Sequence, residues 1–144
     1  ERVFKKLFDG GEAKLSLTDS ENVLESGIDI FVAPPGKVIK SMSLLSGGEQ
    51  ALTSIALYFA ILNIHPAPFC LLDEIEAALD DVNVSRYAEY LHRLTANTQL
   101  ITITHRRGTM EIADRLYGVT MREKGISKIL MINVDEIERN LQPT

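Results

Sequence analysis

Residues 44–62, LLSGGEQALTSIALYFAIL, place a serine, two glycines and an acid directly before a run that is apolar on nearly every side. Ser46 and Glu49 have the S-x-x-E spacing of a capping box, which satisfies free N–H groups at the start of a helix. We therefore expect a long helix from about Gly47 to Ile64. It should stop at His65, because the proline at position 66 disfavours helical geometry in the residue before it.

The capping box does not explain the two glycines, each of which costs roughly 1 kcal/mol relative to alanine inside a helix. In the first turn, Gly47 and Gly48 leave room for another surface to approach the backbone. A helix start with free N–H groups, a hydroxyl and the positive end of the helix dipole suits an anion, above all a phosphate. From this stretch alone, capping and phosphate binding both remain open for Ser46 and the two glycines.

Two further apolar runs end in groups that can do chemistry. FCLLD (69–73) is followed by Glu74, and QLITIT (99–104) is followed by His105. Such runs are typical of strands buried on both faces. At the end of the first run, Asp73 can hold a hydrated Mg²⁺ and Glu74 can orient a water against a phosphoryl group. The alternative is an acidic strand end that only faces solvent; a lone histidine is also more often structural, and only its position relative to these acids makes it a candidate.

The remaining sequence predicts an α/β fold, with a mostly parallel sheet flanked by helices and its polar groups at the carboxyl ends of strands. A short helix closed by Gly10 and Gly11 opens the chain, and period-two alternation then predicts a small antiparallel layer in the first forty residues. A helix capped by Asp80 or Asp81 should follow the first apolar run. A short helix at about 109–115 and two strands, 117–121 and 127–134, joined by a turn at REKG complete the expectation.

Composition is that of one globular domain: 144 residues, 45% of them hydrophobic, and a net charge of −5. The acidic balance argues against a surface that tracks nucleic acid throughout. One basic group is the best local candidate, although a solvated face explains it equally well; its members are Arg106, Arg107, Arg122, Lys124 and Lys128. A single cysteine, Cys70, and the lack of a spanning apolar segment favour a cytoplasmic, membrane-free protein.

The order of three motifs resembles the signature motif, Walker B motif, D-loop and switch histidine of ABC-type ATPases, specifically the bacterial structural maintenance of chromosomes (SMC) family. The motifs are LLSGGEQ (44–50), FCLLDEIEAALDD (69–81) and ITITHRRGTMEIADRLYGVTM (101–121). The similarity is close from Leu44 to Lys128, and the segments 7–19 and 27–37 also resemble the family. DEIEAALDD, in place of the transporter-like DEPTSALD, favours chromosome or repair ATPases over transporters.

The resemblance implies a role for each motif residue. Ser46, Gly47, Gly48 and Glu49 would belong to the contact with the γ-phosphate of an ATP held mainly by an opposing head. Asp73 would serve Mg²⁺ through water, Glu74 would polarise the attacking water, and His105 would sense the γ-phosphate; Asp80 would lie in the D-loop at the interface of two heads. Gln50 departs from the basic residue common after the signature acid, which puts a role for positive charge there in doubt.

The sequence lacks the G-x-x-x-x-G-K-[ST] loop that cradles phosphates. Its one Gly-Lys pair, Gly36-Lys37, is followed by Val38. In the SMC family this loop, Walker A, lies on an N-terminal lobe, so the chain resembles the C-terminal lobe of the head. The resemblance divides it into a coiled-coil stub (1–12), a β-rich segment (13–43) and an α/β core (44–144).

The implied cofactors are ATP and Mg²⁺, and the chain alone should be inactive. The implied partners are the N-terminal lobe, a second SMC head, the winged-helix domain of a kleisin subunit, and DNA in the full complex at the nucleoid. Two alternatives stay open: a kleisin-docking module, with the last strands and residues 135–144 as its surface, and the head of a related double-strand-break repair ATPase.

Overall fold

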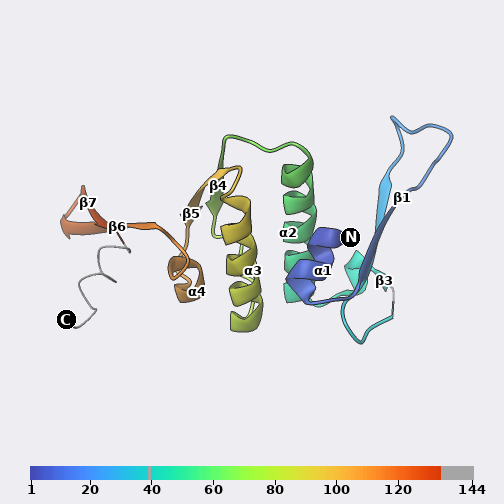
Figure 1. Ribbon diagram of the computed structural model, residues 1–144, viewed down its shortest axis with the longest axis horizontal. Coiled ribbons are helices and arrows are strands. Elements are labelled where there is room, and N and C mark those ends of the chain that lie inside the picture. Colours follow the sequence, from blue (N-terminus) through green and yellow to red (C-terminus); the bar gives the residue numbers. More distant parts are fainter. Residues whose placement is uncertain (39, 134–144) are drawn as a thin grey trace.

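The first forty residues form a short helix and an antiparallel layer, as expected. The structure, a computed structural model, describes residues 1–38 and 40–133. Helix α1 (Arg2–Phe8) ends at Asp9 in left-handed geometry. Strands β1 (Glu12–Leu17), β2 (Ile28–Ala33) and β3 (Lys40–Ser41) pair antiparallel in that order. In Figure 1 this layer lies at one end of the molecule, beside α1 and the start of the next helix.

Helix α2 (Gly47–Ile64) has the predicted bounds and follows the short 3-10 turn η1 (Met42–Leu44). Both hydrogen bonds of the predicted capping box are present between Ser46 and Glu49. The helix ends at His65, directly before Pro66, as the proline rule requires. Its buried positions include Leu52, Ile55 and Phe59, so α2 supplies a large part of the core.

The next unit is a parallel strand pair with a helix between its strands. Strand β4 (Phe69–Asp73) pairs in parallel with β5 (Gln99–Ile103), and Asp73 lies opposite Ile103 in the register. Helix α3 (Asp81–Leu94) connects them and carries one continuous buried stripe. In Figure 1 the starts of α2 and α3 lie toward the same side as α4, which follows β5. The segments that end the strands and start the helices therefore share one side of the molecule.

The chain then forms a four-residue helix and a hairpin. Helix α4 (Arg107–Met110) is shorter and begins earlier than the predicted 109–115. The helix could not extend to residue 115, because Arg115 already belongs to a strand. Strands β6 (Arg115–Glu123) and β7 (Ile126–Asn133) pair antiparallel across the predicted turn. The hairpin extends away from the helices at the opposite end from β1 (Figure 1). Many of its apolar side chains are exposed, among them Val119, Ile129 and Met131.

The core joins α1, β2, α2, β4 and α3. Its fully buried members include Leu7, Val32, Leu52, Phe59 and Tyr87. Phe59 stacks on the rings of Tyr87 and Tyr90, which fixes α2 against α3. Within the described residues, no helix combines the length and apolarity needed to cross a bilayer.

Two expectations about the sheet need correction. The parallel part has only two strands, and the other described pairings are antiparallel, so the sheet is not mostly parallel. Strand β4 is also not covered on both faces: Cys70 and Leu72 are buried, whereas Phe69 and Leu71 are 61% and 58% exposed. The physical reason is that α2 and α3 pack on one face, and the described part of the chain places no layer on the other.

Candidate functional site

The turn after β4 carries Asp73 and Glu74, both exposed. Glu74 adopts φ +47°, a left-handed geometry that is rare for a residue with a side chain. Its N–H donates to the carbonyl of Ile103 at 2.9 Å, and its own carbonyl accepts from the N–H of Ala77 at 3.0 Å. The end of β5 therefore holds the turn in place.

His105 lies beside Glu74, as its position after the neighbouring strand suggested. Its Nδ1 is 3.2 Å from Oε1 of Glu74, and both side chains are exposed. The parallel register brings them together, because Asp73 and Ile103 are partners and the chain continues past both in the same direction. A carboxylate and an imidazole at this distance can both hydrogen-bond to the same water or phosphate group and so orient it.

A buried carboxyl group lies two residues after Glu74 in the sequence. Glu76 is only 1% exposed, and its Oε1 accepts hydrogen bonds from the hydroxyls of Thr104 and, at 3.0 Å, Thr109. The Thr104 hydroxyl also accepts from the N–H of Arg106 at 3.0 Å. The two neighbours of His105 in sequence are therefore both part of a network centred on Glu76.

The signature segment forms a second group at the start of α2. Ser46 Oγ donates to Glu49 Oε2 at 3.0 Å and accepts from the Glu49 N–H at 3.4 Å. Lys37 Nζ is 2.7 Å from the other oxygen of Glu49. This lysine, and then the Ser46 N–H, lower the pKa of Glu49 against an opposing effect of burial. The capping interpretation is confirmed, and Ser46 is also an exposed residue, so this helix start is open to solvent.

The two glycines have different surroundings. A methyl group at Gly47 would meet nothing within 4 Å, whereas one at Gly48 would lie 3.4 Å from the carbonyl oxygen of Ala78. Gly48 therefore faces the segment that follows Glu74 in the same chain, at a distance where a methyl group would make an ordinary van der Waals contact. Gly47 leaves open space at the helix start, which is the arrangement that an approaching second surface needs.

Asp80 caps α3: its Oδ1 accepts from the N–H of Asn83 at 2.9 Å, and its Oδ2 accepts from the Asn83 amide at 3.0 Å. The neighbouring Asp81 is 2.8 Å from the guanidinium of Arg106, which also donates to the carbonyl of Leu79 at 3.0 Å. The segment 79–81 is therefore joined to the loop that carries His105.

The predicted basic group is divided between the start of α4 and the β6–β7 hairpin. Arg106 pairs with Asp81, and Arg107 pairs with Glu111 at 2.9 Å on the same short helix. The other members lie on the β6–β7 hairpin and its turn. Ion pairing therefore accounts for the two arginines, and the solvated-face interpretation fits them better than a nucleic-acid contact.

The described residues contain no group of three or more His, Cys, Asp or Glu side chains arranged for a metal. Asp73 and Glu74 are carboxylates of the type that Mg²⁺ accepts, but they can supply only part of its shell. Mg²⁺ usually keeps several waters and binds one or two carboxylates together with substrate phosphates. The two acids thus fit a Mg²⁺ that is bound together with substrate phosphates.

Sequence reasoning missed three members of the site. In the sequence, Lys37 stands out only as part of a Gly-Lys pair that does not match the phosphate-loop pattern. Its pairing with Glu49 depends on how the segments β2 and η1 fold. Glu76 and Thr104 were not singled out. A second acid two residues after Glu74, within an otherwise apolar or small-residue run, was the available signal for Glu76.

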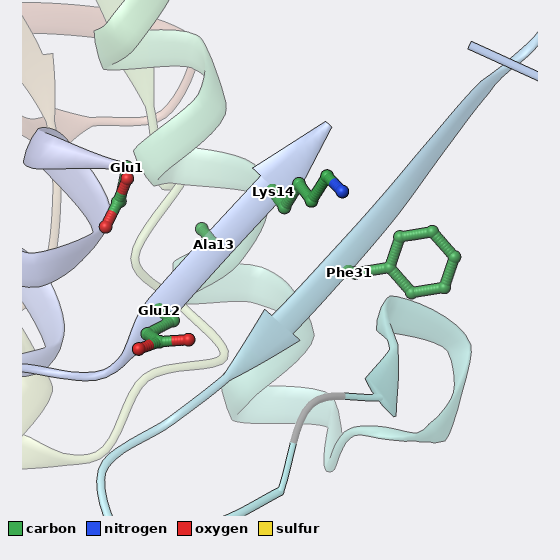
Figure 2. Close-up of a pocket in the computed structure, with 5 residues that line it drawn as sticks. All are labelled: Glu1, Glu12, Ala13, Lys14 and Phe31. Carbon is green, nitrogen blue, oxygen red and sulfur yellow. The ribbon is translucent and has the colours of Figure 1, made fainter. Parts of the chain in front are cut away.

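A surface pocket lies elsewhere, on the β1–β2 layer near the start of α1. Figure 2 shows the residues that line it, which are Glu1, Glu12, Ala13, Lys14 and Phe31. None of the predicted site residues belongs to it. Acidic, basic and aromatic side chains project from it in different directions rather than converging, so it does not compete with the strand-end site.

Comparison with known proteins gives one consistent answer. Residues 6–128 match the family profile described as RecF/RecN/SMC N terminal domain. The chain is 54% identical over 142 residues to the chromosome partition protein Smc of Bacillus subtilis (strain 168), a match that covers 99% of this chain and 12% of that protein. The chain thus spans about an eighth of that relative.

Two solved structures are similar throughout. One is an Smc head bound to the C-winged helix domain of ScpA, with a TM-score of 0.87, 41% identity, and coverage of 96% of this chain and 42% of that one. The other comes from work on ATP-driven dimerization and DNA stimulated activation of SMC ATPases. Its TM-score is 0.84 at 41% identity, with coverage of 97% of this chain and 84% of that one.

Proposed function

This chain belongs to the RecF/RecN/SMC family, and from that premise we propose that it is the C-terminal lobe of the ATPase head of a bacterial SMC chromosome partition protein. In this proposal the Walker A lobe of the same protein supplies the main nucleotide cradle. Two completed heads enclose ATP between them, and hydrolysis separates them. The chain alone is inactive.

The uncovered face of the parallel pair is the observation that carries the proposal. Leu71 and Phe69 on β4 and Ile101 and Ile103 on β5 are all exposed, although they belong to the strands that end at Asp73 and Ile103. Parallel strands normally lie between two covering layers. An apolar face next to Glu74 and His105 is expected when the layer that covers the sheet belongs to another lobe.

The strand-end residues then have separate tasks. Asp73 holds the water shell of Mg²⁺, which when bound neutralises charge on the phosphates. Glu74 orients the attacking water, and His105, 3.2 Å from it, contacts the γ-phosphate. The left-handed backbone at Glu74 supports this assignment, because strained geometry is kept where a side chain must be aimed.

The signature segment acts on the nucleotide of the opposing head. Ser46 and the free N–H groups at the start of α2 meet the γ-phosphate, and the open space at Gly47 lets that surface approach. Glu49 orients Ser46, and Asp80 lies at the same interface. Nucleotide thereby becomes part of the contact between the two heads, and its hydrolysis removes that contact.

A second function, docking of a kleisin winged-helix domain, is favoured by the similar head that was solved with the C-winged helix domain of ScpA. In this chain the exposed apolar hairpin β6–β7 is the candidate surface. Residues 135–144, the other part of that surface, lie outside the described residues. Co-purification with a kleisin fragment should survive Glu74→Gln; loss of binding in that variant would count against docking that is independent of catalysis.

The repair-ATPase alternative remains a proposal of lower rank, because the similar curated relative is a chromosome partition protein. A contact with DNA is proposed only for the complete protein, by analogy with the DNA stimulated SMC ATPase. The hinge of the full-length protein separates the two alternatives. A zinc hook in that position would favour repair, and a hinge domain would favour chromosome partition.

Reconstitution tests the proposed function. We define the complete head as this chain joined to its Walker A lobe with their coil stubs. We expect no ATP turnover by the chain alone, turnover by the complete head, and ATP-stabilised head pairs with Glu74→Gln. Ser46→Arg should abolish that pairing. Turnover by the chain alone, or pairing that persists with Ser46→Arg, would contradict the proposal.

A further inference from the structure

Glu76 is an ionisable side chain in a buried position. It is 1% exposed, and among the described residues its Oε2 has no hydrogen-bond partner. Burying a carboxylate costs stability, and apolar residues of similar volume often serve a core at least as well. The position of Glu76 therefore calls for a reason other than stability.

The hydrogen bonds of Glu76 join two segments that are distant in sequence. Its Oε1 receives the hydroxyls of Thr104 and Thr109, which lie 28 and 33 residues further along the chain. Thr104 is the residue before His105, while Glu76 is two residues after Glu74. One buried oxygen thus ties the loop of the histidine to the turn of the acid.

A second connection runs parallel to the first near the surface. The N–H of Arg106 donates to the Thr104 hydroxyl, and its guanidinium reaches the Leu79 carbonyl and Asp81. His105 is thereby flanked on both sides by residues fastened to segment 74–81. The exposed His105 and Glu74 side chains are free to meet a ligand, while the backbone beneath them is fixed.

We propose that Glu76 is a positioning residue, whose buried carboxylate holds the loops of Glu74 and His105 in one mutual geometry. This inference rests on the proposed ATPase function and deepens it. Glu76 does not touch the nucleotide. It acts through Thr104 and Thr109, so that the acid and the histidine reach the phosphate together instead of independently.

The test uses the complete head with Glu76→Ala, Glu76→Gln and Thr104→Val. A shift of the reacting groups by an ångström lowers turnover by roughly 100-fold, so we expect kcat to fall by roughly 10- to 100-fold in Glu76→Ala and Thr104→Val. KM for ATP and ATP-stabilised head pairing should stay near their original values. Glu76→Gln keeps an acceptor oxygen and should recover most of kcat.

Thr98→Val is the matched control, because Thr98 is also buried but lies outside this network. It should leave kcat unchanged. The double variant Glu76→Ala/Thr104→Val should lose no more than either single one, because both changes break the same connection. If Glu76→Ala does not fold, Thr104→Val decides the question alone.

Two results would overturn the inference: wild-type kcat in Thr104→Val, or a loss of kcat that only follows the folded fraction, as measured by thermal unfolding. Glu74→Gln, assayed in parallel, separates this failure from that of the proposed function. If Glu74→Gln is inactive while Thr104→Val is fully active, only the positioning role is wrong. If Glu74→Gln turns over ATP normally, the proposed site itself is wrong.

Discussion

At the residue scale, substitution of Gly47 should have opposite effects on the stability of the head and on its contact with another surface. A methyl group there would meet nothing within 4 Å, and the residue lies in helical geometry. Gly47→Ala should therefore raise the stability of the complete head, by about 0.4–1 kcal/mol, because alanine reduces the freedom of the unfolded chain. The same methyl group should weaken ATP-stabilised head pairing, because it fills the space left for the opposing nucleotide.

Thermal unfolding and ATP-dependent cross-linking of head pairs measure the two effects of Gly47→Ala. Ser54→Ala is the control, since Ser54 lies on an exposed face of the same helix. It should leave pairing unchanged. Pairing that is undiminished in Gly47→Ala would mean that the open space at the helix start has no function.

Glu49 gives the signature segment a defined pH dependence. Lys37 lowers the pKa of Glu49 from its ordinary value of 4.5. A lowered pKa in the folded state stabilises the fold above the ordinary value, and this contribution is lost as the pH falls through the lowered one. We expect Glu49→Gln to reduce stability at neutral pH and to make it less sensitive to acid below the ordinary pKa.

Denaturant unfolding of the wild type and Glu49→Gln at neutral and acidic pH checks this sign. Lys37→Gln should also make the free energy of unfolding less dependent on pH, because it removes the main cause of the lowered pKa of Glu49. If the two proteins lose stability in parallel as the pH falls, the Lys37–Glu49 pair does not contribute.

Several residues of the site followed from the sequence, and the reason is that they stand next to elements with a clear pattern. Glu74 comes directly after β4 and His105 two residues after β5, so the parallel register brings both segments to the same end of the strand pair, where the two side chains lie 3.2 Å apart. Glu76 and Lys37 could not be found this way. Their partners are 28 and 12 residues away in sequence, and only the packed loops decide those distances.

At the element scale, Asp80 tests whether the D-loop acid has a structural role besides the proposed interface role. Both of its carboxylate oxygens bind Asn83 at the start of α3. Asp80→Ala removes this cap and should destabilise the complete head by roughly 1 kcal/mol. Asp80→Asn keeps the cap and should remain close to the wild type. Thermal unfolding compares them; equal losses in both variants would show that the charge, and not the cap, stabilises the helix.

The bounds of elements were predictable where local chemistry sets them. Ser46, Glu49 and Pro66 determine both ends of α2, and these signals need no tertiary information. The covering of β4 was not predictable in the same way. FCLLD is apolar at every position before its acid, but this pattern does not show whether a second layer covers Phe69 and Leu71, because that depends on how distant elements pack.

At the scale of the whole molecule, the described residues leave one face of the β4–β5 pair uncovered. Its core closes around α1, α2 and α3, and the described strands form three separate sheets. This chain covers 84% of a chain in a solved SMC ATPase structure, so a chain of similar size occurs in that structure. The uncovered face of β4 and β5 is where we propose that the other lobe attaches.

The double variant Leu71→Thr/Ile103→Thr should therefore increase the solubility of the isolated chain and weaken its association with the Walker A lobe. Both side chains are about half exposed or more, at 58% and 50%, so their replacement removes apolar surface from contact with water and should increase the solubility of the isolated chain. In the complete head the same change removes buried area, at about 25 cal/mol per Å². Association with a separately purified Walker A lobe should consequently become weaker by at least tenfold, as about 1.4 kcal/mol would produce.

Leu24→Thr is the control, because Leu24 is 96% exposed on the β1–β2 loop, and it should change solubility alone. Titration calorimetry of the two lobes decides: unchanged association would mean that this face is not where the sheet is completed.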